Sequence, residues 1–103
     1  MIRRQAQVFK AGIFAGVFQE LEDRSFRFEY TPDYHGPPIS LSMPVQQREW
    51  RFDRFPPFFD GLLPEGPQLQ ALLKIGKLDR TDFFGQLLAV GLDLVGDVTV
   101  KPS

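Results

Sequence analysis

The chain has 103 residues, a formal net charge of −1 and no cysteine, which predicts a single domain, residues 1–103, that buries roughly 65% of its unfolded surface. The near-neutral charge gives no overall attraction to nucleic acid or an anionic membrane, and no run approaches the ~18 apolar residues of a membrane span. The lack of cysteine excludes disulfides, thiolate zinc sites and cysteine nucleophiles, and it fits a reducing cytoplasm, where we expect the protein.

The N-terminal third is predicted to form an antiparallel sheet. Residues 6–9 and 13–18 are apolar and rich in β-branched and aromatic side chains, and Gly12 supplies a turn between them, which predicts a hairpin. Residues 25–31 then alternate strictly between apolar and polar side chains, which predicts a strand. The apolar face of this strand, expected in the core, holds Phe26, Phe28 and Tyr30.

Residues 31–54 combine a loop with shorter extended segments. Three prolines and a glycine within residues 31–38 predict a loop, and His35 in that loop has no companion ligands for a metal. Residues 39–43 alternate again and predict a short strand. Residues 46–54 predict an edge strand or an extended arm, in which Trp50 either packs on the edge or anchors an interface.

Residues 55–66 form an unusual run of three Phe, two Leu, three Pro and two Gly. Proline fixes φ and glycine permits positive φ, so the run is predicted to follow a fixed irregular path with one short helical turn. The chain as a whole contains 11 phenylalanines. A core this small hides so much aromatic area with difficulty, so we expect part of it to face a partner.

The C-terminal third is predicted to be mainly helical. Residues 68–78 and 80–88 place apolar side chains at helical spacing, with Pro67 opening the first helix, Gly76 ending it and Asp79 capping the second. Gly91 is expected to end the second helix. Residues 98–100 predict a strand that pairs with the N-terminal sheet. The predicted fold class is α+β, a small antiparallel sheet with two or three helices packed on one side.

The sequence predicts neither enzymatic activity nor a cofactor. It contains no Gly-rich phosphate loop of Walker or kinase type and no His-Arg-Asp or Asp-Phe-Gly catalytic set. Its acidic residues from Asp60 to Asp97 are scattered and offer no pair that could act as acid and base. We therefore expect a binding protein.

Several stretches together resemble one known family. After an N-terminal β region they are, in chain order, residues 41–44 (LSMP), 57–66 (PFFDGLLPEG), 80–84 (RTDFF) and 96–100 (GDVTV). In this order they resemble the N-terminal subdomain of the HipA-family serine/threonine kinase toxins, which carries the signature PFF-[DN]-x-LLPEG. In that family the kinase follows the last stretch, so the resemblance implies the subdomain alone. One departure is Pro67, followed by Gln68 and Leu69, where many members have an aromatic residue.

The resemblance implies a role within a toxin–antitoxin system. A lone subdomain is similar to HipS, the antitoxin of three-gene modules in which it binds and neutralises HipT, a shortened HipA-like serine/threonine kinase. A HipB-like helix-turn-helix DNA-binding protein is the implied third component. The alternatives are a subunit that completes a split kinase without inhibiting it, and a co-repressor. In the family the kinase substrate is an aminoacyl-tRNA synthetase.

Residues 58–66 are expected to form the inhibitory loop. A rigid apolar loop loses little entropy on binding, and carboxylates seldom serve a core. The candidate partner contacts are Trp50, Phe58, Phe59, Asp60, Leu62, Leu63, Glu65 and Leu69. For Phe58, Phe59 and Leu62 the alternative is that they seal the sheet against the helices.

Overall fold

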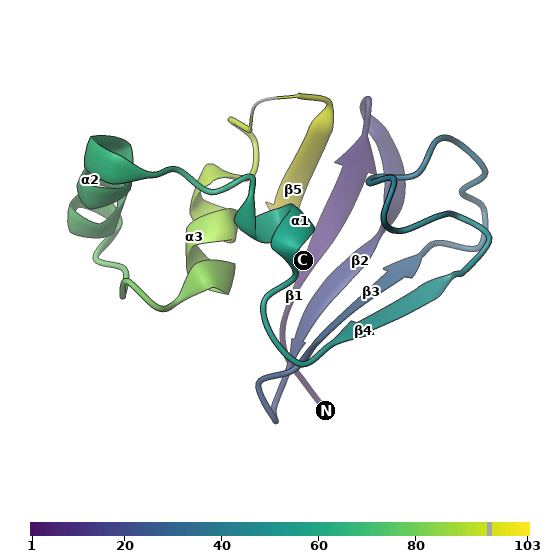
Figure 1. The fold of residues 1–103 in the computed structure, drawn as a ribbon, viewed down its shortest axis with the longest axis horizontal. Helices are drawn as coiled ribbons and strands as arrows, with labels where there is room; N and C mark the ends of the chain where they lie inside the picture. Colours follow the sequence, from purple (N-terminus) through teal and green to yellow (C-terminus); the bar gives the residue numbers. More distant parts are fainter. Residues whose placement is uncertain (95) are drawn as a thin grey trace.

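The computed structural model describes residues 1–94 and 96–103, and across these it has one five-stranded antiparallel sheet and three helices (Figure 1). The strands follow the order β4-β3-β2-β1-β5 across the sheet. In chain order the elements are β1 (Ile2–Lys10), β2 (Ile13–Leu21), β3 (Phe26–Tyr30), β4 (Glu49–Phe52), α1 (Pro57–Asp60), α2 (Gly66–Gly76), α3 (Phe83–Val90) and β5 (Val98–Pro102). The predicted α+β class is confirmed.

The N-terminal hairpin is confirmed and is longer than predicted. β1 and β2 pair antiparallel up to Lys10 opposite Ile13, so that two residues, Ala11 and Gly12, make the turn. Both have positive φ, 50° and 81°. Two-residue hairpin loops of this handedness match the twist of the strands, and glycine adopts such angles without steric cost.

The remaining strands extend this hairpin on both sides. β3 pairs with β2, and its Phe26, Phe28 and Tyr30 are all buried, as the alternation predicted. β4 pairs with β3 and lies at one edge of the sheet, which confirms the edge-strand interpretation of this segment. β5 pairs antiparallel with β1 at the other edge, as expected for the terminal strand.

The strand predicted at residues 39–43 is wrong. The Tyr30 hydroxyl donates to the Met43 carbonyl at 2.6 Å and accepts from the Ile39 N–H at 3.1 Å, while the Met43 N–H donates to the Ser40 carbonyl at 3.0 Å. These bonds close a turn that buries Ile39 and Met43 and leaves Leu41 93% exposed. The alternation therefore marks the two buried ends of a turn.

An aromatic stack joins the helices to the sheet. The Phe18 ring of β2 lies 4.1 Å from the Phe59 ring of α1 and 5.2 Å from the Phe84 ring of α3, centroid to centroid. All three side chains are buried. Aromatic pairs in these arrangements add to the stability gained from area burial. Much of the phenylalanine surplus is thus packed on itself, and Phe83, at 40% exposure, is the most exposed phenylalanine.

The second long helix begins later than predicted. α3 starts at Phe83, and its N-cap is Asp82, whose Oδ1 accepts from the Gly85 N–H at 3.1 Å. The prediction of Asp79 as the cap is wrong, because its carboxylate accepts from the N–H and hydroxyl of Thr81 at 2.7 and 2.6 Å. Asp79 therefore closes a turn of its own just before the helix.

The ends of the helices otherwise follow the predicted pattern, with one change. Pro67 lies in the first turn of α2 as predicted, but the left-handed residue that ends the helix is Lys77, with φ 53°, and not Gly76. Gly91 follows α3, and a Cβ there would overlap the carbonyl oxygen of Val100 in β5. Within the described residues, no helix has the length and apolarity needed to cross a bilayer.

Candidate functional site

The proline- and phenylalanine-rich run is held by its own backbone hydrogen bonds. In α1 the N–H groups of Asp60 and Gly61 donate to the carbonyls of Pro56 and Pro57 at 3.0 and 2.9 Å. The N–H groups of Leu62 and Leu63 also donate to backbone carbonyls, each to the residue three positions earlier in the chain. The predicted single helical turn is confirmed. Residues 61–65, which lead from α1 to α2, are called the strap below.

The two adjacent phenylalanines of α1 have different surroundings. Phe59 is fully buried against Phe18, so the structure places it in the core and not among exposed partner contacts. Phe58 packs edge-on against Phe59 at 5.1 Å and is half-buried. The interpretation that Phe59 seals the sheet against the helices is therefore the one that the structure favours, because a buried ring cannot reach a partner without unfolding the stack.

The strap presents apolar side chains between two carboxylates. Leu62 and Leu63 pack against the core while remaining partly exposed. Asp60 and Glu65 are exposed, and neither side chain has a hydrogen-bond or ion-pair partner among the described residues. Carboxylates that stabilise nothing in their own domain are available to a partner.

Two hollows open beside the strap, and it lines both. The larger, about 650 Å³, continues onto Gln68 of α2 and the end of α3. The smaller, about 270 Å³, lies between α2 and the start of α3. The smaller hollow brings together four of the predicted contacts, namely Asp60, Leu63, Glu65 and Leu69.

Trp50 lies apart from this group. It stands on the edge strand β4 opposite Phe28, and its indole N–H donates to the Gln47 carbonyl at 2.9 Å. It packs against the core while remaining partly exposed, and it lines neither hollow. Trp50 is therefore not part of the surface that the strap and its two hollows form.

Comparison with known proteins assigns the fold to a family. Residues 6–101 match the HipA N-terminal domain family. The chain belongs to this family. A solved structure described as the N-terminal domain of HipA toxin is similar to this HipA N-terminal domain with a TM-score of 0.79 and 33% identity, covering 100% of this chain and 95% of that one. The family resemblance and the fold inferred from the sequence motifs are confirmed, and with them a HipA-related role.

Two relatives place the domain in different contexts. An uncharacterized protein of Haemophilus influenzae is 37% identical over 98 residues, which are 95% of this chain and 92% of that protein. A putative kinase, Y4dM, of Sinorhizobium fredii is 36% identical over 85 residues, which are 77% of this chain but 21% of that protein. The HipA N-terminal domain thus accounts for nearly all of one relative and about a fifth of the other.

A charged cluster fixes the start of α3 to the sheet. The Arg4 guanidinium of β1 contacts Glu20 Oε1 at 2.8 Å and Asp82 Oδ1 at 2.6 Å, and it lies over the Phe84 ring at 5.2 Å. Its hydrogen bond holds the pKa of Asp82 below the usual range, and the Gly85 N–H acts in the same direction. This cluster positions the first turn of α3, on which Phe83 lies.

Among the residues of the smaller hollow that sequence reasoning missed are Phe83 and Arg80. Phe83 and Phe84 both lie in the segment that the sequence predicts as a helix, but neighbouring residues on a helix point about 100° apart and seldom share a face. The structure buries Phe84 and leaves Phe83 beside the hollow. The 80–84 motif holds both residues, so the motif itself was the available signal.

Proposed function

We propose that this HipA N-terminal domain is an antitoxin of the HipS type, which binds and neutralises a shortened HipA-like serine/threonine kinase, HipT, in trans. The observation that carries the proposal is the strap surface, where half-exposed Leu62 and Leu63 lie between the exposed carboxylates of Asp60 and Glu65, beside two hollows. Apolar side chains on a backbone already fixed by hydrogen bonds make efficient anchors, because little entropy is lost on docking.

The two relatives support an interaction in trans. In the Sinorhizobium fredii relative the matched region is 21% of the protein, so the domain has the rest of its own chain to pack against. In the Haemophilus influenzae relative the matched region is 92% of the protein, so little other chain is present for the domain to contact. A surface that packs against a kinase within one chain is suited to the same contact between two chains. A stable pair of this kind would bury on the order of 1,500 Å².

In this proposal the domain binds the kinase and has no catalytic activity of its own. In this proposal the strap lies at or beside the active-site cleft of the kinase, and Asp60 and Glu65 meet basic or metal-binding groups there, since charge-assisted hydrogen bonds to carboxylates are strong. A HipB-like DNA-binding protein is the expected third component of the complex. Direct contact of this domain with DNA is not part of the proposal.

Co-expression tests the proposal. A HipA-like kinase that lacks this domain is produced alone and together with this chain, and growth, complex formation and phosphorylation by the kinase are measured. We expect toxicity of the kinase alone, its relief by the chain, and a purified complex with little kinase activity. A complex that keeps full activity would favour the alternative of a subunit that completes the kinase. Failure to co-purify at micromolar concentrations would contradict both.

A further inference from the structure

Helix α2 differs from the other two helices because none of its 11 residues is buried. It lies at the end of the molecule farthest from the sheet, beyond α1 and α3 (Figure 1). Leu69, Leu72 and Leu73 are half-buried, and Ile75 is 83% exposed. Surface helices normally bury an apolar stripe, and isolated helices shorter than about 12–15 residues are marginal in water. The apolar side of α2 therefore lacks the cover that such a helix usually has.

The two ends of α2 are nevertheless fixed. Pro67 lies in its first turn, where a missing N–H costs nothing. At the other end, the N–H groups of Lys77 and Leu78 both donate to the Leu73 carbonyl, the second at 3.0 Å. These bonds close the last turn and satisfy a carbonyl that would otherwise face solvent. α2 is thus a preformed element that holds its exposed side chains in place.

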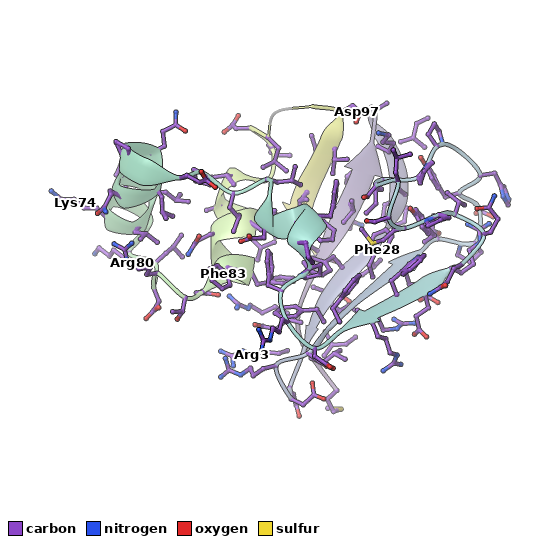
Figure 2. All side chains as sticks on the ribbon, in the orientation of Figure 1. Arg3, Phe28, Lys74, Arg80, Phe83 and Asp97 are labelled. Carbon is purple, nitrogen blue, oxygen red and sulfur yellow. The ribbon has the colours of Figure 1, made fainter. Side chains whose placement is uncertain are left out.

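The free end of α2 is basic. Lys74, Lys77 and Arg80 are exposed, and none has an ion-pair partner within the part of the chain that the structure describes. Figure 2 shows Lys74 and Arg80 at this same end of the molecule. The helix carries no acidic residue, and the nearby Asp79 carboxylate, which accepts from Thr81, offsets only one of the three positive charges. The group formed by Lys74, Ile75, Lys77 and Arg80 is called the basic helix end.

We propose that the basic helix end is a second contact zone, next to the strap, that takes an acidic surface segment of the partner kinase with an apolar side chain at its centre. This inference rests on the proposed function, because it names the chemistry of the kinase surface. Three exposed cations within five residues of an exposed isoleucine along the chain are complementary to carboxylates that accompany an apolar residue. Arg80 lines the smaller hollow together with Pro64 and Glu65, so the zone adjoins the strap.

The same charges count against two other occupants. A second copy docked by two-fold symmetry would place the same patch on both sides of the interface, and so would bring the three cations against three cations. Nucleic acid is recognised mainly through phosphates and base edges. It would leave Ile75 without a role, and the chain as a whole has a net charge of −1. An acidic protein surface uses both the cations and the isoleucine.

The test measures association and dissociation rates of the kinase with wild-type chain and two double variants, at low and high salt. The variant Lys74→Glu/Lys77→Glu reverses the charge of the basic helix end. The variant Arg24→Glu/Arg54→Glu is a matched control, since it changes the net charge equally at two exposed arginines outside α2 and the strap. A third variant, Ile75→Ala, removes the apolar centre. Equal thermal melting of all four proteins confirms that they are folded.

Electrostatic steering raises association rates by tenfold or more and fades with salt. We expect Lys74→Glu/Lys77→Glu to slow association about tenfold or more at low salt, with a smaller effect at high salt, while the control stays within about twofold of wild type. Ile75→Ala should speed dissociation, because it removes a desolvated contact.

Other outcomes overturn the inference in distinguishable ways. If wild type neutralises the kinase and the charge-reversed variant binds like the control, the contact zone is wrong while the proposed function stands. If wild type does not bind the kinase, both fall. A wild-type dimer that Lys74→Glu/Lys77→Glu dissolves would assign the surface to a second copy. Salt-sensitive binding to a DNA duplex that the same variant abolishes would assign it to nucleic acid.

Discussion

Arg4 and Asp82 join the first strand of the sheet to the start of the last helix, with Arg4 Nη2 and Asp82 Oδ1 2.6 Å apart. The same carboxylate caps α3 through the Gly85 N–H. The Asp82 side chain therefore both caps the helix and joins it to the sheet through Arg4, which is 78 residues earlier in the chain.

Replacing Asp82 by alanine should lower the free energy of unfolding by about 1–2 kcal/mol, because loss of an N-cap alone typically costs ~1 kcal/mol and the ion pair is only partly exposed. Urea unfolding measures this loss. Asp79→Ala serves as the comparison, since Asp79 closes an exposed turn and caps no helix. A greater loss for Asp79→Ala than for Asp82→Ala would mean that the helix begins where the sequence pattern had placed it.

The ion pair should also make stability depend on pH. The pKa of Asp82 in the folded protein is lowered by Arg4, so its charged form stabilises the fold. This contribution is fully present above the unfolded-state pKa of ~3.9 and is lost as pH falls through the lower folded-state pKa. Asp82→Asn keeps a good capping residue but removes the charge. The stability difference between wild type and Asp82→Asn should therefore shrink on acidification below about pH 4, and a difference that is the same at pH 7 and pH 2 would contradict the ion-pair role.

Phe59→Ala should destabilise the domain by about 3–5 kcal/mol, the usual cost of removing a buried phenylalanine. The ring is fully buried and stacks on Phe18, so its loss leaves a cavity between the sheet and α1. Phe83→Ala, at the 40%-exposed position, should cost much less. Chemical denaturation compares the two variants. Equal losses would show that burial does not separate these phenylalanines as described.

Asp60→Ala and Glu65→Ala should leave the melting temperature nearly unchanged, because neither carboxylate has a partner among the described residues. Both should weaken binding to the kinase and its neutralisation, if the strap docks as proposed. Glu22→Ala is a matched control at an exposed carboxylate in the turn between β2 and β3. Loss of several kcal/mol of stability in both variants, or neutralisation as good as that of wild type, would mean that the docking surface lies elsewhere.

The strands of the hairpin and β3 could be predicted because their information is local. Alternation of side chains, β-branched residues and a glycine turn lie within the segments themselves. The family motif at residues 57–66 could also be recognised from the sequence, and so could the single helical turn that it contains. In these regions each short stretch of sequence agrees with the surrounding fold.

The structure differs from the sequence-based predictions where two local conformations suit the sequence equally well. At these positions a contact with a residue distant in the chain determines which conformation forms. Residues 39–43 alternate like a strand, but the Tyr30 hydroxyl forms hydrogen bonds with two of their backbone groups, the Ile39 N–H and the Met43 carbonyl. Asp79 and Asp82 both suit an N-cap, and it is Asp82 that Arg4 contacts. Phe58 and Phe59, like Phe83 and Phe84, are the same residue type side by side, and the stack with Phe18 buries Phe59 and Phe84.

The sequence by itself therefore determined the fold class, the order of most elements and the family, since periodicity, turn residues and motifs are properties of short segments. Only the tertiary structure decided which aromatic ring is buried, which aspartate caps α3, and that no residue of α2 is fully buried. These choices depend on side chains tens of residues apart, because burial and ion pairing are set by what the fold brings into contact.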